Sequence, residues 1–285
     1  MQSYQFWKEA DYVFGLNKDH LYQYTINDEF RTRIDRFNNP FKNYVTYVNT
    51  DESSLDDILS KIKVMYENVN SCAIYVRKKD RPENLKELLL TRNWIHVVEI
   101  DHLILDLTTL NESDIQEKRK PIKDTRFKLR KVSNKEISQA PMNKQFYDLH
   151  KNGFAHIPLS LDSYTKTFMN NVIEEEKGKY NTNFVYFIDN RPISMTSIQE
   201  MGTVQDKRIA LLGGAVTHKE FQGNGLYSSL LIERILDAKK QGIDIITTDA
   251  RNDSSSPIIQ KFGFKKVDTI DVFVHPSWNA NKNTD

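Results

Sequence analysis

A glycine-containing turn carries the clearest chemical potential in this sequence. It spans residues 222–227, QGNGLY, between a run typical of a strand, LLGGAV, and a run typical of a helix, LYSSLLIERILDAKK. Glycines at such a junction let the backbone turn tightly and leave its N–H groups exposed. The helix that follows adds partial positive charge at its N-terminus, so the turn can hold an anion. A turn that uses its glycines only for geometry is the alternative interpretation.

Other recognised site patterns do not fit this sequence. A P-loop needs a Gly-Lys-Ser/Thr sequence, which is absent, and the dinucleotide fingerprint would need a third glycine where Ser228 stands. Cys72 is the only cysteine, and the histidines have no ligand-like spacing. We therefore expect neither a nucleotide loop of those kinds nor a metal site.

The sequence around the turn resembles a known motif. Residues 216–231, VTHKEFQGNGLYSSLL, are similar to the coenzyme-A-binding motif of the GNAT (N-acetyltransferase) superfamily, whose core is Gln/Arg-x-x-Gly-x-Gly/Ala. Gln222 and Gly225 match its first and fourth positions, and Gly223 stands where the family usually has a glycine after the Gln/Arg, whereas Tyr227 replaces the small residue at the sixth position. Downstream, Asn252 and the turn 263–264, Gly-Phe, match the closing half of the family, so that the resemblance covers the second half of the chain.

The resemblance implies a coenzyme role for several residues. Backbone groups of Ala215, Val216 and Thr217 would bind the pantetheine arm of acetyl-CoA, and Val216 or Thr217 would polarise the thioester carbonyl with a backbone N–H. Asn252 would lie beside the sulfur. The backbone N–H groups that would hold the pyrophosphate are those of Gln222, Gly223, Asn224, Gly225, Leu226 and Tyr227.

Transfer of an acyl group to an amine also needs a base and a proton donor for the leaving thiolate. Many relatives place a tyrosine five residues before the phenylalanine of the Gly-Phe turn, but here that position is Ile259, which cannot donate. Tyr227 is the substitute candidate for the acid. Glu200, Asp249 and His218 are candidate bases, and each could equally be a solvated side chain.

The elements that must position this site follow from the periodicity of the second half. Strand-like and helix-like runs predict the order β-α-α-β-β-β-α-β-α-β, with the long helix at 226–240. This order predicts an α/β fold, a mixed sheet with helices on both faces, as in a GNAT-like acyltransferase.

The first half predicts a smaller β-α-β-α-β unit, and the polar segment 108–125 predicts a linker. We therefore expect two domains, 1–120 and 121–285. The run LKELLLTRNWIHVVEIDHLILDL parallels PIIQKFGFKKVDTIDVFVH, which suggests a degenerate GNAT-like repeat. In the first half, the turn after the strand-like run NYVTYVN contains Asp51 and Glu52 instead of glycines. These carboxylates would repel a pyrophosphate, so we expect one coenzyme per chain.

Composition excludes several classes of partner. Forty basic and thirty-nine acidic side chains nearly cancel, so neither nucleic acid nor a membrane surface is an expected partner. No signal peptide or membrane span is visible, which predicts a cytoplasmic protein. The predicted function is an N-acetyltransferase for a small-molecule or amino-acid-like amine, and a homodimer remains open. The alternatives are a catalytically decayed coenzyme-A-binding regulatory protein and a different mixed α/β fold.

Overall fold

The computed structural model describes residues 22–35, 43–69, 72–122, 124–154 and 160–276. Residues up to 120 are called the N-half below, and the remainder the C-half. The elements of the N-half are β1 (Tyr22–Ile26), β2 (Phe30–Asp35), β3 (Tyr44–Val48), α2 (Leu55–Met65), β4 (Ala73–Arg77), α3 (Leu85–Thr91), β5 (Ile95–Asp106) and α4 (Glu112–Gln116). From β3 to β5 the order is the predicted β-α-β-α-β.

The C-half has the predicted mixture of strands and helices. Its elements are β6 (Lys128–Val132), α5 (Asn134–Ser138), α6 (Met142–Gly153), α7 (Leu161–Glu176), β7 (Asn181–Ile188), β8 (Arg191–Val204), β9 (Lys207–Leu212), β10 (Val216–Thr217), the 3-10 turn η2 (Lys219–Phe221), α8 (Leu226–Lys240), β11 (Ile245–Arg251), α9 (Ser255–Gln260) and β12 (Lys265–Val274).

Two predicted elements are divided in the structure. The first helix in the order predicted for the second half is two helices, because a capping box of Ser133 and Glu136 begins α5 and Pro141 separates it from α6. The strand-like run LLGGAV belongs to β9 only as far as Leu212, and strand structure resumes as β10. The segment expected to be a linker contains α4, which is capped by Asn111 and buries Ile115 in the core.

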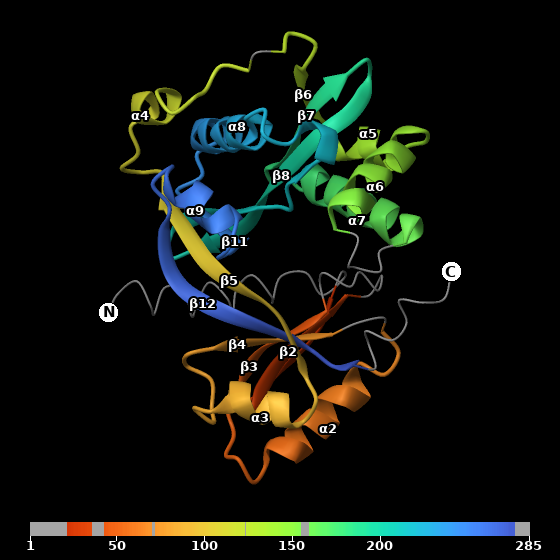
Figure 1. The fold of residues 1–285 in the computed structure, drawn as a ribbon, viewed down its shortest axis with the longest axis vertical. Helices are drawn as coiled ribbons and strands as arrows, with labels where there is room; N and C mark the ends of the chain where they lie inside the picture. The colour runs from red at the N-terminus through yellow and green to blue at the C-terminus, as the bar shows by residue number, and fades with distance from the viewer. Residues whose placement is uncertain (1–21, 36–42, 70–71, 123, 155–159, 277–285) are drawn as a thin grey trace.

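All strands belong to one sheet, in the order β1-β2-β3-β4-β12-β5-β11-β9-β8-β7-β6, with β10 on β8. β12 lies between β4 and β5, and β5 lies between β12 and β11. Each half therefore places its last strand in the sheet of the other half. Figure 1 shows β5 and β12 running together from one half into the other. The boundary at residue 120 lies in the connection from β5 to β6, but the sheet continues across it.

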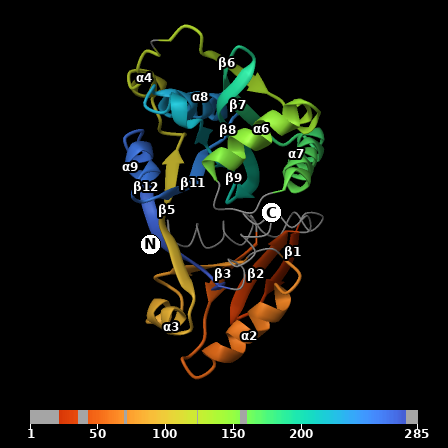
Figure 2. The same cartoon turned by 45° about the vertical axis from the view of Figure 1, so that its right-hand side comes forward.

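The helices cover the sheet differently in the two halves. In the N-half, α2 and α3 pack on Val45 and Ile74, which point to one face of the sheet. In the C-half, α8 and α9 cover the face of Ile246, and α6 and α7 cover the opposite face at Val185. Figures 1 and 2 show α2 and α3 on the side of the N-half sheet that is turned away from the C-half. The other face of that sheet is turned toward the C-half.

Candidate active site

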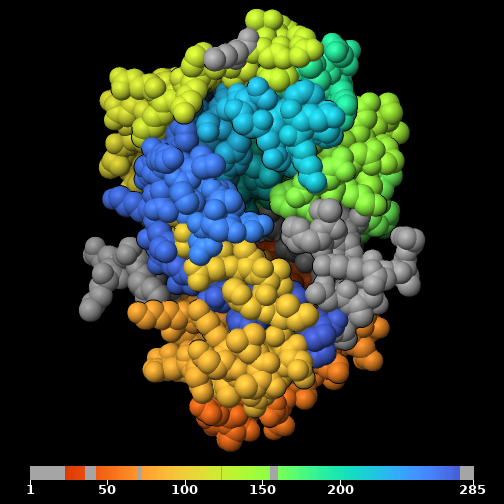
Figure 3. All heavy atoms as spheres, viewed as in Figure 1, coloured from red at the N-terminus to blue at the C-terminus, as the bar shows by residue number. Residues whose placement is uncertain are grey.

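The central feature of the C-half is a gap between two neighbouring strands. β9 and β11 run parallel and pair up to Leu211 and Thr247. Beyond this point β11 continues along β5 as far as Arg251, whereas the chain after β9 turns to β8 as β10. The strands therefore part at their carboxyl ends. In the space-filling view the surface is hollowed between the blue atoms of α9 and the green atoms of α6 (Figure 3).

A β-bulge accompanies this parting. Ile198 pairs with Leu212, and Met195 pairs with Val216. An advance of three residues along β8 therefore corresponds to four residues on the chain of β9 and β10, which contains one extra residue. The backbone N–H groups of Gly214 and Ala215, in the bulge, donate to no group among the residues that the structure describes. They remain available to a ligand.

The register of β10 distinguishes between Val216 and Thr217. His218 donates its backbone N–H to the carbonyl oxygen of Ile193 over 2.8 Å. Because hydrogen-bonded pairs alternate in an antiparallel ladder, Val216 also directs its N–H at β8, and Thr217 directs its N–H away from β8. Of the two groups predicted to polarise a thioester, the Thr217 N–H therefore faces the gap.

The glycine turn has the predicted geometry of an anion-binding loop. Gly223 and Gly225 have φ angles of +81° and +78°, in the left-handed region that favours glycine. The N–H groups of Gly223, Asn224 and Gly225 make no hydrogen bond within the described part of the chain, and α8 begins directly afterwards. Gln222 differs from the expectation, because its N–H already donates to the carbonyl of Lys219 over 3.3 Å.

Tyr227 is oriented inward rather than toward the loop surface. Its ring packs against the core between α8 and the sheet. The charge of the Arg234 guanidinium, two turns further along the helix, acts on the tyrosine hydroxyl. Burial raises the pKa of Tyr227, and burial lowers the pKa of Arg234 to about 10. A tyrosine whose pKa is raised by burial is a poor proton donor, which argues against the predicted acid role. Ile259 is buried in the same core.

Glu200 lies far from the loop. Both oxygens of its carboxylate bind the guanidinium of Arg208, at 2.8 Å and 3.1 Å, and this pairing lowers the pKa of Glu200 against the opposing effect of burial. Arg208 also donates to the carbonyl of Gln241, just after the end of α8. Because α8 has 15 residues, Glu200 is about 22 Å along the helix from the loop. Glu200, one of the predicted bases, is therefore part of a structural ion pair with Arg208.

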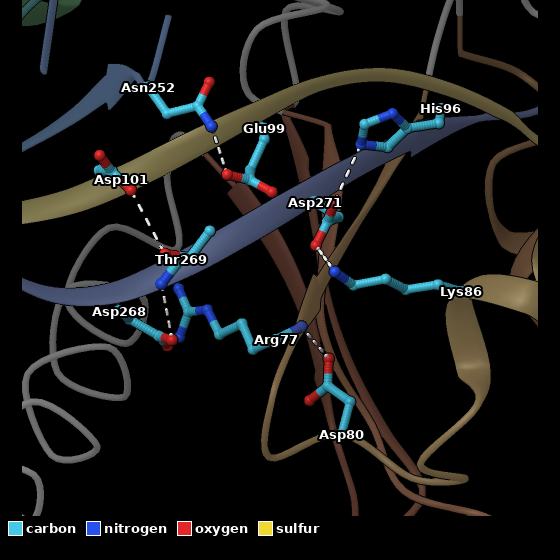
Figure 4. Close-up of polar contacts among 10 residues, drawn as sticks. All are labelled: Arg77, Asp80, Lys86, His96, Glu99, Asp101, Asn252, Asp268, Thr269 and Asp271. Atoms are coloured by element: carbon cyan, nitrogen blue, oxygen red, sulfur yellow. Dashed lines mark hydrogen bonds and ion pairs between the residues drawn. The ribbon is translucent and has the colours of Figure 1, made fainter.

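Asn252 is held by the N-half. Its side-chain amide donates to the carboxylate of Glu99 on β5, and its backbone N–H donates to the Glu99 carbonyl over 3.2 Å. Figure 4 shows this contact beside the paired strands β5 and β12. Asn252 follows β11 directly, so it stays near the parting of the strands, but its amide has a protein partner.

Asp249 has a partner that sequence reasoning missed. Its Oδ1 lies 2.7 Å from Nδ1 of His102, and the other ring nitrogen, Nε2, lies 3.2 Å from Oγ1 of Thr247. His102 belongs to β5 of the N-half and stands directly opposite Asp249 in the β5–β11 ladder. A carboxylate on Nδ1 fixes the tautomer whose Nε2 can accept a proton. His218 instead contacts Arg191, at 3.1 Å from its Nε2.

The N-half lacks the features of this gap. At the end of β3, an isolated parallel bridge joins Asn49 to Arg81 and closes the edge. The turn before α2 satisfies itself, since Asp51 Oδ1 accepts hydrogen bonds from the hydroxyl of Ser53 at 2.6 Å and from the N–H of Ser54 at 2.8 Å. An anion would have to displace a carboxylate there.

Comparisons with known proteins identify the fold. No family model and no curated protein matches the sequence. Among solved structures, a GCN5-related N-acetyltransferase from Kribbella flavida is similar at a TM-score of 0.60 and 11% identity, with 95% of each chain covered. A tandem GNAT protein of the clavulanic acid biosynthesis pathway has a TM-score of 0.56 and 11% identity, covering 86% of this chain and 77% of its own.

The chain has the GNAT fold. A further structure with this likeness, a functionally unknown protein from Staphylococcus epidermidis, covers 89% of this chain and 94% of its own at a TM-score of 0.59 and 14% identity. The predicted fold class and its tandem arrangement are confirmed. The two halves of this chain have corresponding orders of elements. The order β3-α2-β4-α3-β5 in the N-half corresponds to the order from β9 to β12 in the C-half.

Neither a metal site nor a membrane-spanning helix is found in the described part of the chain. Over the described residues, no group of three His, Cys, Asp or Glu side chains is arranged to hold a metal ion. No helix within the same ranges is long and apolar enough to cross a membrane.

Proposed function

We propose that the chain is an N-acetyltransferase that transfers an acetyl group from acetyl-CoA to a small-molecule amine. The observation that carries the proposal is the parting of β9 and β11 next to the glycine turn. It combines free N–H groups along one strand end with a helix N-terminus, which suits a ligand that has amides at one end and phosphates at the other.

Acetyl-CoA would lie along this gap. The N–H groups of Gly214, Ala215 and Thr217 would hold the pantetheine arm and the thioester carbonyl, and those of Gly223, Asn224 and Gly225 would hold the pyrophosphate. The coenzyme supplies the activated acyl group. A side chain at Gly223 or Gly225 would have open space around its Cβ, so the glycines are required by the backbone conformation and not by crowding within the chain.

His102 would act as the base. Its Nε2 takes one proton from the ammonium group of the acceptor, while Asp249 stabilises the imidazolium through Nδ1. The free amine attacks the thioester carbon, a C–N bond forms and the C–S bond breaks. The nitrogen then loses a second proton, which balances the thiolate that leaves as the free thiol.

A second candidate is a coenzyme-A-binding protein that has lost catalysis. Two observations favour it: Ile259 occupies the usual tyrosine position, and Tyr227 is packed against the core, where burial raises its pKa. The two candidates differ in turnover, because only an enzyme would release coenzyme A thiol when amines are added.

The test combines calorimetry with a thiol-release assay. We expect one coenzyme A per chain, since the N-half turn is closed by Asp51. We also expect turnover across an amine panel that falls roughly 100- to 10,000-fold in His102→Gln, as for loss of a general base, with coenzyme affinity unchanged. Binding without turnover would favour the second candidate, and absence of binding would refute both.

A further inference from the structure

The uncovered face of the N-half sheet has an unusual composition. Side chains alternate along each strand, so that Val45 and Ile74 pack under α2 and α3 while their neighbours Tyr44 and Tyr75 lie on the other face. Arg33 on β2 belongs to the same face. A face turned toward the other half of a protein is commonly apolar, whereas this one presents arginines and tyrosines.

A cavity of about 160 Å³ separates this face from the C-half. Its N-half wall contains three arginines and three tyrosines, namely Arg31, Arg33, Arg77, Tyr24, Tyr44 and Tyr75. The opposite wall contains His102, Thr247 and Asp249, together with Leu211. Leu211 and Thr247 are the last paired residues before β9 and β11 part. The cavity therefore reaches the point where the two strands part.

The two walls of the cavity differ in charge. Asp249 is the one acidic side chain among its described lining residues, and it faces three guanidinium groups. Burial is the largest influence on the pKa of Tyr75 and raises it. The charge of Asp249 raises this pKa further, whereas the charge of Arg33 lowers it. A ligand with a cationic and an anionic end would match this polarity.

The arginine nearest the aromatic rings is held in a defined position. The Arg33 guanidinium lies 3.9 Å from the centre of the Tyr44 ring, and Tyr44 stacks on Tyr75 with 4.9 Å between ring centres. Stacking involves the face of a guanidinium, whereas its hydrogen bonds to an anion form at the N–H groups of its edge. Carboxylate and phosphate groups accept two such bonds side by side.

We propose that this cavity is the acceptor site, and that the acceptor is a small amine that also carries an anionic group, a carboxylate or a phosphate. The inference rests on the proposed acetyltransferase function. The ammonium group would lie at His102 and Asp249, beside the gap, and the anionic group would lie at Arg31 and Arg33. A cavity of this size, below the 300–1,000 Å³ typical of ligand pockets, suits a small acceptor.

Matched pairs of amines test the inference. Phenylalanine is compared with phenethylamine, and phosphoethanolamine with ethanolamine, by thiol release from acetyl-CoA and by thermal stabilisation of the protein in the presence of coenzyme A. We expect the anionic member of at least one pair to have a kcat/KM roughly 10- to 100-fold higher, the effect of a charge-assisted hydrogen bond. The preferred pair distinguishes carboxylate from phosphate.

Variants of the arginines locate the effect. Arg33→Gln and Arg31→Gln should abolish the preference by raising KM for the anionic amine, and Arg33→Lys should retain part of it. The matched control is Arg92→Gln, because Arg92 lies at the end of α3 on the helical face of the N-half and pairs with Asp56. Melting curves establish that each variant is folded.

The outcomes separate this inference from the function on which it rests. If coenzyme A does not bind, the acetyltransferase proposal fails. If coenzyme A binds but each neutral amine is used, or stabilises the protein, as well as its anionic partner, the acceptor inference is wrong. The inference is also wrong if folded Arg33→Gln and Arg31→Gln keep the preference.

Discussion

Gly223 and Gly178 share a backbone conformation but not a location. Their φ angles are +81° and +82°, and neither has an atom within 4 Å of a Cβ placed on it. Gly178 follows α7, whereas Gly223 lies in the turn before α8. Substitutions at the two glycines can therefore be compared to distinguish the free-energy cost of a strained backbone from the loss of a contact to the ligand.

We expect Gly223→Val and Gly178→Val to lower the melting temperature similarly, since each costs about 1–2 kcal/mol of left-handed strain. Only Gly223→Val should weaken coenzyme A binding, by roughly 10-fold or more, because a displaced loop loses at least one N–H contact to the pyrophosphate. Calorimetry of both variants checks this. Equal affinities in the two variants would show that the loop does not bind the coenzyme.

Tyr227 gives a prediction that opposes the one from sequence. Its ring is packed against the core, and burial raises the pKa of its hydroxyl. We expect Tyr227→Phe to keep kcat within about 2-fold and to cost at most about 1 kcal/mol of stability, because the ring that fills the core is retained. A loss of kcat near 100-fold with unchanged stability would restore Tyr227 as the acid.

At the scale of elements, the site depends on a strand that stops pairing. β9 and β10 would form one strand if the bulge at Gly213–Ala215 were absent, and the N–H groups that now face the gap would then be paired. Gly213 is packed closely against Ser197, because a Cβ at position 213 would displace the Ser197 hydroxyl. The bulge is therefore fixed by local packing as well as by pairing.

The turn after β4 contains a buried carboxyl group that responds to pH. Asp80 accepts a hydrogen bond from the backbone N–H of Arg77 at its Oδ2 (Figure 4), while its Oδ1 has no partner among the described residues. Burial raises the pKa of Asp80 from 3.8 to about 6. Because the folded state favours the protonated form, stability falls as the pH rises from about 4 to about 6, and the loss persists above pH 6.

We therefore expect Asp80→Asn to raise the melting temperature at pH 7.5 and to have little effect at pH 4. Asp124→Asn is the control of opposite sign, because its hydrogen bond to Arg126 lowers the pKa of Asp124. That variant should lower stability slightly at pH 7.5. Melting curves at both pH values check the pair. A uniform effect of Asp80→Asn at all pH values would contradict the assignment.

At the scale of the whole molecule, the two halves exchange their last strands. β12 supplies the neighbour of β4, with Val272 opposite Tyr75, and β5 supplies the neighbour of β11. Either half alone would expose an unpaired strand edge and would lose a strand of its own core. The hydrogen-bonded pair of His102 and Asp249, which we propose as the base and its supporting carboxylate, exists only because of this exchange.

We expect neither fragment 1–120 nor fragment 121–285 to unfold cooperatively by itself. Mixing or co-expressing the two should restore a single transition and coenzyme A binding, because β5 and β12 would then pair again. Calorimetric melting of each fragment and of the mixture is the measurement. A fragment 121–285 with the melting temperature of the full chain would show that the halves are independent domains.

The sequence by itself determined the glycine turn at 222–227, which we propose binds the coenzyme, and most of the order of elements in the C-half. The spacing of Gln222, Gly223 and Gly225 is local, and the strand and helix on either side have clear periodicity, so no distant contact is needed to recognise the loop. The same local patterns predicted the order of elements from β3 to β5. They did not predict β1 and β2, because Arg31 and Arg33 make β2 look like a charged loop when only its neighbours are considered.

Only the tertiary structure decided which side chains meet. His102 and Asp249 are 147 positions apart, and the register of β5 against β11 brings them to 2.7 Å. The arginines of β2 face them because a strand of each half completes the sheet of the other. Pairing between distant strands depends on the whole sheet and leaves no periodic signal in either segment. For the same reason Glu200 could be proposed as a base until Arg208 was seen beside it.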